Sequence, residues 1–136
     1  EFRRVLFRSD VRAAGEAILS ALELNEDDRL KPKIVSNQIV RHLDDHQTML
    51  INRMRHGNLI LAGQTLFVLE CEPAAYAALA ANEAEKAANI NILEVRAVGS
   101  FGRVYIGGEE EDVEVAREAA VKAVEALSGR VINKEA

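Results

Sequence analysis

The sequence predicts one α/β domain of the α+β, ferredoxin-like type, an antiparallel or mixed sheet with two main helices on one face. Apolar runs rich in β-branched residues at 33–41, 66–69 and 90–98 indicate strands. Helical spacing over 74–89 and 109–127 indicates the two main helices. A length of 136 residues suits one domain with a real core.

Composition and charge exclude several classes of protein. The chain is 49% hydrophobic and 29% charged, and no apolar run approaches the length of a bilayer span. Its net charge of -5 argues against nucleic-acid binding, which needs a basic surface. The single cysteine cannot form an internal disulfide, which is compatible with a reducing cytosol. We therefore expect a globular protein with neither a membrane nor a nucleic acid as partner.

The first part of the chain divides into three segments. Residues 1–9 resemble the in-frame translation of a sequencing adapter, although a short basic arm that touches a partner is the alternative. Residues 10–24 have helical spacing, and the charged loop 25–29 follows, closed by Pro32. We expect the domain proper to begin after this loop.

The segment 33–41 is predicted to be the first strand, and 48–51 a second, short one. Between them, Asp44–His46 is interpreted as a turn. The same residues could be metal ligands, but three adjacent side chains cannot converge on one ion without help from elsewhere. The basic residues Arg53, Arg55 and His56 are interpreted as a solvated turn.

A buried central strand is predicted at 66–69, followed by a helix over 74–89 that Pro73 opens. Cys71 lies where the strand gives way to this helix; it is either a nucleophile or, as we favour, a small packed side chain. The helix is rich in alanine. Its small side chains allow close packing against a sheet and a neighbouring subunit, but high helix propensity alone explains them equally well.

A Gly-x-x-Gly turn, Gly99–Gly102, joins the predicted strands 90–98 and 103–106. Without a Cβ at either end, such a turn can bring its backbone close to a ligand or to copies of itself. It could be a simple hairpin, a pore lining or a phosphate cradle. Phosphate loops normally lead into a helix N-terminus, and this turn leads into a strand, so the cradle ranks last.

The last helix begins with four acidic residues, 109–112, which suit the positive end of the helix dipole; an acidic metal site is the alternative. Aligning Asp10 with Asp112 matches the two helices without a gap. We therefore interpret 10–31 as the last helix and linker of a preceding copy of the domain, 32–130 as the domain itself, and 131–136 as a tail. The buried stripe of the last helix, 109–127, is predicted to comprise Val113, Ala116, Ala120, Val124 and Leu127.

No catalytic constellation is visible. The histidines at 42, 46 and 56 have no serine or cysteine partner at a recognisable spacing, and no pair of carboxylates lies in an apolar setting. We therefore expect no enzymatic activity, no cofactor and no metal.

Three segments together resemble the bacterial microcompartment shell domain, or BMC domain: 66–70 (LFVLE), 80–90 (AANEAEKAANI) and 99–103 (GSFGR). With the strand 33–41 placed before the domain core, the order resembles the circularly permuted form of this domain. It is most similar to the large tandem-domain shell proteins of propanediol, ethanol and ethanolamine utilisation compartments. The resemblance covers nearly all of residues 10–130.

The resemblance implies a structural role. Members of this family form flat hexagonal tiles, and tandem-domain members form trimers that imitate a hexamer. Lys86 matches the lysine at the tile edge, and Arg41 matches an arginine beside it. Val40 and His42 flank Arg41 where prolines commonly stand, so this second match departs from the family pattern.

The resemblance also implies that Gly99, Ser100, Phe101 and Gly102 line a central pore, with Phe101 narrowing it. The implied partners are copies of the chain in homotrimers, paralogous shell proteins and small metabolites that cross the pore. The implied location is a microcompartment in the bacterial cytoplasm. The alternative function is a small-molecule-sensing regulatory domain, in which the Gly99–Gly102 loop touches an effector.

Overall fold

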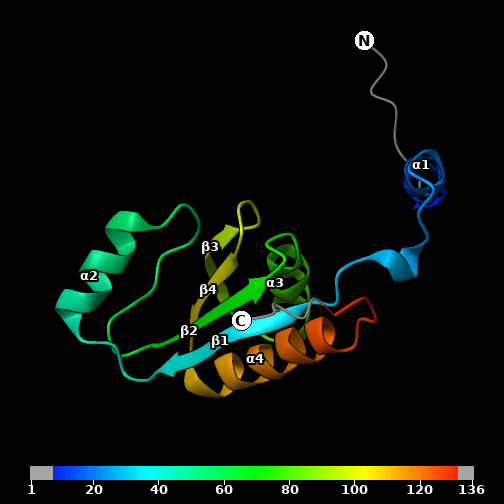
Figure 1. Cartoon of the computed structure of the whole chain (residues 1–136). Helices are drawn as coiled ribbons and strands as arrows, with labels where there is room; N and C mark the ends of the chain where they lie inside the picture. The colour runs from blue at the N-terminus through cyan, green and yellow to red at the C-terminus, as the bar shows by residue number, and fades with distance from the viewer. Residues whose placement is uncertain (1–7, 132–136) are drawn as a thin grey trace, which may run out of the picture. The chain divides into compact units, whose positions relative to one another are not determined.

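A computed structural model describes residues 8–131 of the chain. The chain divides into two units, which are described separately: residues 1–31 together with 128–136, and Pro32–Leu127 (Figure 1). The predicted tail lies almost wholly outside the described residues, as does most of the predicted adapter segment.

The larger unit is built on a four-stranded sheet in the order β1-β2-β4-β3, with every neighbouring pair antiparallel. Its strands are β1 (Lys33–Val40), β2 (Thr65–Glu72), β3 (Asn91–Arg96) and β4 (Gly102–Gly108). The predicted α+β class and the strands around 33–41, 66–69, 90–98 and 103–106 are confirmed.

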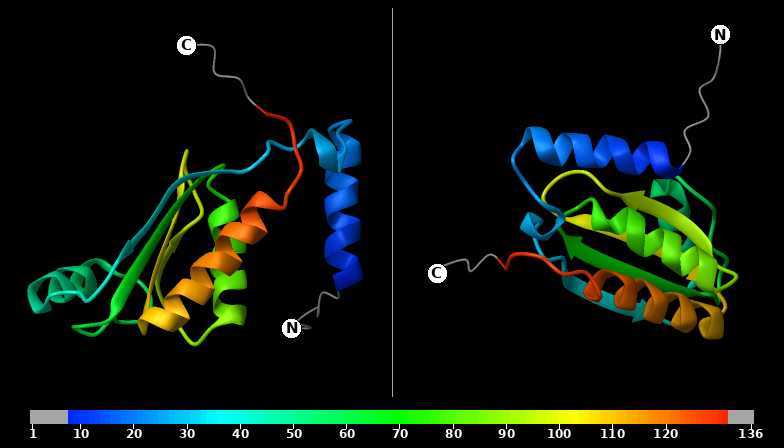
Figure 2. Two further views of the ribbon diagram at one scale, coloured as in Figure 1. Left: turned by 90° about the horizontal axis from the view of Figure 1, so that it is seen from below. Right: turned by 90° about the vertical axis from the view of Figure 1, so that its right-hand side faces the viewer.

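Two helices, α3 (Tyr76–Ala87) and α4 (Glu110–Glu125), cover one face of the sheet (Figure 2). Alternation along β2 directs Phe67 and Leu69 toward them, and both side chains are fully buried. The helices also pack against each other, α3 through small side chains that permit a close approach. The buried positions of the two helices are Ala77, Ala80, Ala81 and Ala84 on α3, and Val113, Ala116, Ala120 and Val124 on α4.

The prediction of a short strand at 48–51 is wrong, because this segment lies inside helix α2 (Asp45–Met54). The Asp44 side chain caps that helix by accepting a hydrogen bond of 2.9 Å from the His46 amide, so the predicted turn is a helix start. Thr48 and Ile51, three residues apart, lie on the inward side of the helix.

Helix α2 lies at the end of the sheet where β1 ends and β2 begins (Figure 1). The Asn52 amide fastens it to the following segment: Nδ2 donates to the Ile60 carbonyl at 2.8 Å, and Oδ1 accepts from the Ile60 amide at 3.0 Å. Ile60 is fully buried with Leu66 and Leu93, on the sheet face opposite α3 and α4. We call this second face the open face.

Replacing Asn52 with alanine should destabilise the domain by about 2 kcal/mol, since both polar groups of the Ile60 backbone lose their partner in a partly buried setting. Urea denaturation followed by circular dichroism measures the change. Gln47→Ala, at an exposed position of the same helix, is the control and should change stability by less than about 0.5 kcal/mol. Equal effects of the two substitutions would contradict this role of Asn52.

The smaller unit contains helix α1 (Arg8–Ala21), close to the predicted helix 10–24, and the short 3-10 helix η1 (Glu26–Asp28). No residue of α1 is buried. The apolar stripe of α1, which continues to Leu22 just after it, is therefore exposed: Val11, Ile18 and Leu22 each present about 60% of their surface.

Candidate functional site

The β3–β4 hairpin holds both predicted glycines, and they have different roles. Gly99, at the tip, has a φ of 104°, and no atom lies within 4 Å of the place where a Cβ would stand. Gly102 is buried at the start of β4, where a Cβ would lie 2.2 Å from the Ala74 carbonyl oxygen and 2.7 Å from the Ala77 Cβ. Gly99 therefore permits the turn, and Gly102 permits the hairpin to lie against the start of α3.

The tip presents a polar and an apolar surface together. Ser100 is exposed, and the Phe101 side chain is 41% exposed. Val98 is 90% exposed, the most exposed of the large hydrophobic residues described. Sequence reasoning did not single out Val98, because a valine at the end of a predicted strand is usually half-buried.

Cys71 is fully buried behind the hairpin, opposite Gly102 in the β2–β4 register. Burial raises the pKa of the Cys71 thiol, and Glu70 adds to the rise, while a hydrogen bond with the Gly102 backbone opposes it. The thiol is therefore protonated at neutral pH and shielded from solvent. This environment matches the expected packed side chain rather than a nucleophile.

In the native protein, Cys71 should react with iodoacetamide at least about 100-fold more slowly than in urea, because the thiol is protonated and inaccessible. Its pKa is higher in the folded state than in the unfolded state. The contribution of the buried, protonated Cys71 thiol to the free energy of unfolding is therefore complete at neutral pH. It declines as the pH rises above about 8.5, the ordinary thiol pKa. Mass spectrometry of time-resolved alkylation measures the rate, and equal rates in buffer and urea would contradict the burial.

Lys86 lies in the last turn of α3. Its side chain is 63% exposed, and Nζ lies 2.8 Å from Oε1 of Glu83, which also accepts a hydrogen bond from Asn82. The hydrogen bond from Lys86 lowers the pKa of the Glu83 carboxyl. The ammonium group is thus oriented along its own helix but remains open to a further contact.

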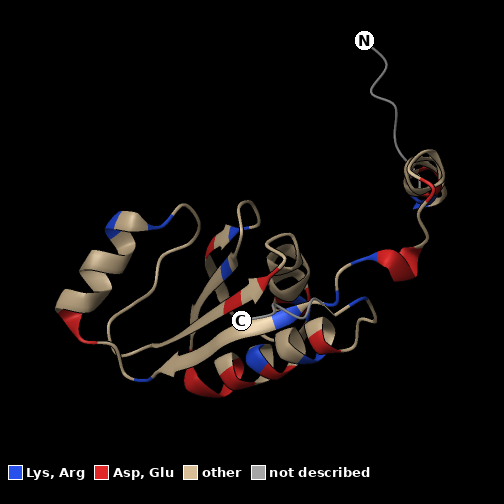
Figure 3. Ribbon diagram, viewed as in Figure 1, with Lys and Arg blue, Asp and Glu red and all other residues tan. Residues whose placement is uncertain are grey.

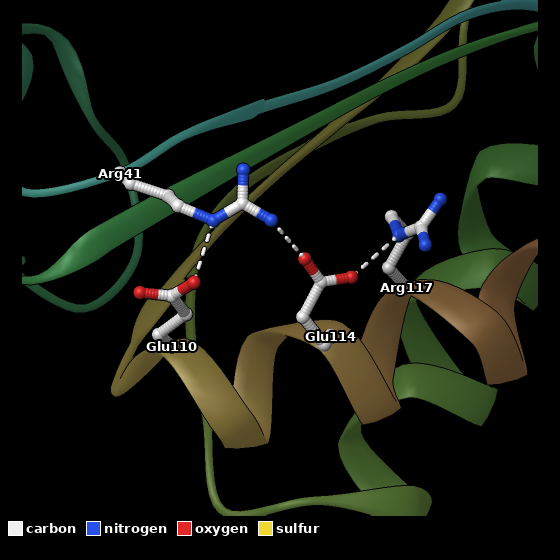
Figure 4. A network of polar contacts seen from close by, with 4 residues as sticks. All are labelled: Arg41, Glu110, Glu114 and Arg117. Carbon is white, nitrogen blue, oxygen red and sulfur yellow. Dashed lines mark hydrogen bonds and ion pairs between the residues drawn. The ribbon is translucent and has the colours of Figure 1, made fainter.

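Arg41 follows β1 and binds the first turns of α4 (Figure 4). Its Nε lies 2.6 Å from Oε1 of Glu110, and its terminal nitrogen lies 2.5 Å from Oε1 of Glu114. Arg117 approaches the other oxygen of Glu114 at 3.0 Å. The hydrogen bond to Glu110 is the main cause of a raised pKa of Arg41. Arg41 therefore ties the end of β1 to the helix layer.

The departure from the family pattern at position 42 has a backbone explanation. His42 has a φ of 53°, in the left-handed region. Proline is locked near a φ of about -65°, so it does not fit this conformation. The chain turns sharply after Arg41 by a route that a proline at 42 would prevent.

The candidate site residues lie at two opposite ends of the domain. Helix α3 starts beside Gly102 and carries Lys86 in its last turn, and its 12 residues span about 18 Å. Arg41 and the start of α4 lie at the same end of the sheet as the end of α3, because β1 ends and β4 ends there. The structure thus places Lys86, on α3, and Arg41, just after β1, at one end, and the hairpin tip at the other.

The metal sites considered as alternatives for Asp44–His46 and for the acidic run 109–112 find little support in the structure. Within residues 8–131, no group of three or more His, Cys, Asp or Glu side chains is arranged to hold a metal ion. In the acidic run 109–112, Glu109 accepts a hydrogen bond from Gln64 and Glu110 binds Arg41. None of the helices described is long and apolar enough to cross a membrane.

Comparison with known proteins identifies the family. The BMC domain family matches residues 65–136, more than half of the chain. The chain therefore belongs to the BMC domain family of microcompartment shell proteins, as the three sequence segments indicated.

Curated relatives narrow this further. The chain is 66% identical over 123 residues to the carboxysome shell protein CcmP of Synechococcus elongatus, and 44% identical over 124 residues to the carboxysome shell protein CsoS1D of Hydrogenovibrio crunogenus. These matches include 90% of this chain but only 58% and 60% of the relatives, so the chain spans about three fifths of their length. Both are named as shell proteins, which agrees with the expectation of a structural protein rather than an enzyme.

Solved structures agree with this assignment to the BMC domain family. A double-ringed trimeric shell protein from the RMM microcompartment superposes with a TM-score of 0.90 at 38% identity, over 93% of this chain and 62% of its own. A fused permuted hexameric shell protein from the same microcompartment gives 0.87 at 42% identity, over 90% and 61%. The CutR flat hexamer, at 20% identity over 74% of this chain and 90% of its own, gives 0.59, which shows a shared fold.

Proposed function

We propose that this domain is part of a trimeric, pseudohexameric shell tile, with the β3–β4 hairpin at the central axis and Lys86 at the tile edge. One observation carries the proposal: the hairpin tip and Lys86 lie at opposite ends of α3. A tile needs one surface around its axis and another at its perimeter, and both must be exposed. Lys86, Val98 and Ser100 meet that requirement.

We further propose that the domain is circularly permuted. The family match begins at residue 65, the first residue of β2, so β1 and α2 precede the matched region. Both nonetheless belong to the same compact unit, in which β1 pairs with β2 along its length. The fused permuted hexameric shell protein, at 42% identity, supports this interpretation.

Helix α1 supports a tandem arrangement. With Asp10 aligned to Asp112, Val11, Ala14 and Ile18 of α1 and Leu22 just after it fall at the four buried positions of α4. None of them is buried in this chain. A stripe of that pattern suits a surface like the one that buries α4, and we propose that α1 is the last helix of a preceding BMC domain.

The pore is proposed to pass small metabolites between the hairpin tips of the assembled domains. Ser100 supplies a hydroxyl, while Val98 and Phe101 supply apolar surface that narrows the opening. The names of the curated relatives favour a carboxysome as the compartment, in place of the propanediol, ethanol or ethanolamine compartments expected from the sequence.

Sedimentation equilibrium of the natural full-length protein tests the assembly. The proposal predicts a mass of three chains or of a multiple of three, together with no tight binding of small metabolites by calorimetry. A monomer, or a compact oligomer that binds one metabolite tightly and never associates further, would instead support the small-molecule-sensing alternative.

A further inference from the structure

Lys86, proposed to lie at the tile edge, is paired with a carboxylate of its own helix. Its Nζ lies 2.8 Å from Oε1 of Glu83, one helical turn earlier on α3, and Asn82 Nδ2 donates to the same oxygen at 2.8 Å. The Lys86 side chain is 63% exposed and the Glu83 side chain 35%. The ammonium group is therefore the outer member of the pair, and the carboxylate lies closer to the domain.

Glu83 retains the capacity to accept from a second cation. Both of its hydrogen bonds fall on Oε1, and within residues 8–131 the structure shows none on Oε2. An ionised carboxylate offers acceptor sites on both oxygens. The hydrogen bond from Lys86 lowers the pKa of the Glu83 carboxyl, which is therefore charged at neutral pH. Ala78 and Ala87, exposed on the same helix, are small and leave the pair accessible.

Other acidic residues lie at this end of the domain but are engaged elsewhere. The first turn of α4 is densely acidic, as Figure 3 shows in red, and Arg41 binds both Glu110 and Glu114. Among the residues that the structure describes, Glu83 is the only carboxylate within ion-pair distance of Lys86. The charge of the edge lysine is therefore balanced locally by Glu83.

This balance matters when two edges meet. An edge that presented lysine alone would repel a second edge of the same kind, and the repulsion grows as the contact excludes water. A charge left without a counter-ion in such a contact is also costly. One carboxylate beside each lysine removes the net charge and supplies an acceptor to the ammonium group opposite.

We propose that Glu83 allows this edge to meet another lysine-bearing edge: its Oε1 holds Lys86, and its Oε2 accepts a hydrogen bond from the edge lysine of the facing tile. The inference rests on the proposed tile edge at Lys86 and adds the partner of that edge, which is a cationic edge on a second tile. Glu83 is a positioning residue for Lys86 and a contact residue for the facing lysine.

Pelleting of layers formed by the full-length protein, at about 50 mM and about 300 mM salt, tests this role. Glu83→Gln keeps the shape of the side chain and removes its charge. It should raise the protein concentration needed for layers at least about fivefold at low salt. Glu85→Gln, at an exposed glutamate of the same helix, is the control and should change that concentration less than about twofold.

The response to salt distinguishes this role from simple stabilisation of the helix. In the unmodified protein, added salt should raise the concentration needed for layers, because it screens attraction between unlike charges. In Glu83→Gln it should lower that concentration, because it screens repulsion between lysines. Glu83→Asp, which keeps the charge, should retain the direction seen in the unmodified protein. The thermal midpoint of Glu83→Gln should shift by less than about 2 °C.

The outcomes separate this inference from the tile proposal. If Lys86→Asp abolishes layers while Glu83→Gln behaves like the unmodified protein in both threshold and salt response, the inference is overturned and the tile edge stands. Unchanged layers in Lys86→Asp, or no layers from the unmodified protein, would overturn both.

Discussion

Replacing Gly102 with alanine should destabilise the domain by about 3 kcal/mol, a large share of the 5–15 kcal/mol typical of folded domains. The new Cβ would stand 2.2 Å from the Ala74 carbonyl oxygen, a backbone atom that no side-chain rotation can move. The hairpin would have to lift away from the start of α3, which would expose Cys71 behind it. Urea denaturation measures the loss, and faster alkylation of Cys71 reports the local opening.

Gly99→Ala is the matched control in the same hairpin. No neighbouring atom lies within 4 Å of its Cβ position, so only the backbone penalty of its φ of 104° remains, about 1 kcal/mol. A larger loss of stability at Gly99 than at Gly102 would contradict the close contact between the hairpin and α3.

Replacing Lys86 with aspartate should abolish the association of tiles into layers and leave the trimer intact. The substitution places a carboxylate in the last turn of α3, beside Glu83, and removes the cation proposed to meet its symmetry mate at the edge. The protein concentration needed for layers to form should rise at least about tenfold. The fraction of protein in the pellet after centrifugation measures it.

Lys122→Asp provides the control for a general effect of charge, because Lys122 is likewise an exposed lysine in the last turn of a helix, α4. It should change the pelleted fraction by less than twofold on the expectation that isolated surface charges contribute little. Unchanged layer formation by Lys86→Asp would remove Lys86 from the tile edge.

The parts of the fold that sequence reasoning predicted are those with strong local patterns. The alternation through Phe67 and Leu69, the alanine-rich helix before Lys86 and the stripe on α4 each specify an element through neighbouring residues. Helix α2 was missed because the apolar residues Met49–Ile51 look like a short strand. The overlooked signal was Asp44, a residue type that commonly caps a helix.

The site was predictable only where its residues are neighbours in the chain. The Gly99–Gly102 hairpin could be recognised from spacing, but the close approach of Gly102 to Ala74 depends on tertiary packing. The partners of Arg41 lie 69 and 73 residues away, beyond the reach of any local pattern. The interpretation of Lys86 as an edge residue came from the family resemblance, since an exposed lysine near a helix end is common.

Electron microscopy of the purified full-length protein tests the central claim most directly. The account predicts flat layers with hexagonal order at low salt, in which each tile has a central opening and the Lys86→Asp variant gives separate tiles. Discrete particles without layers at any concentration, in a protein that binds a small molecule tightly, would contradict a shell role for this domain.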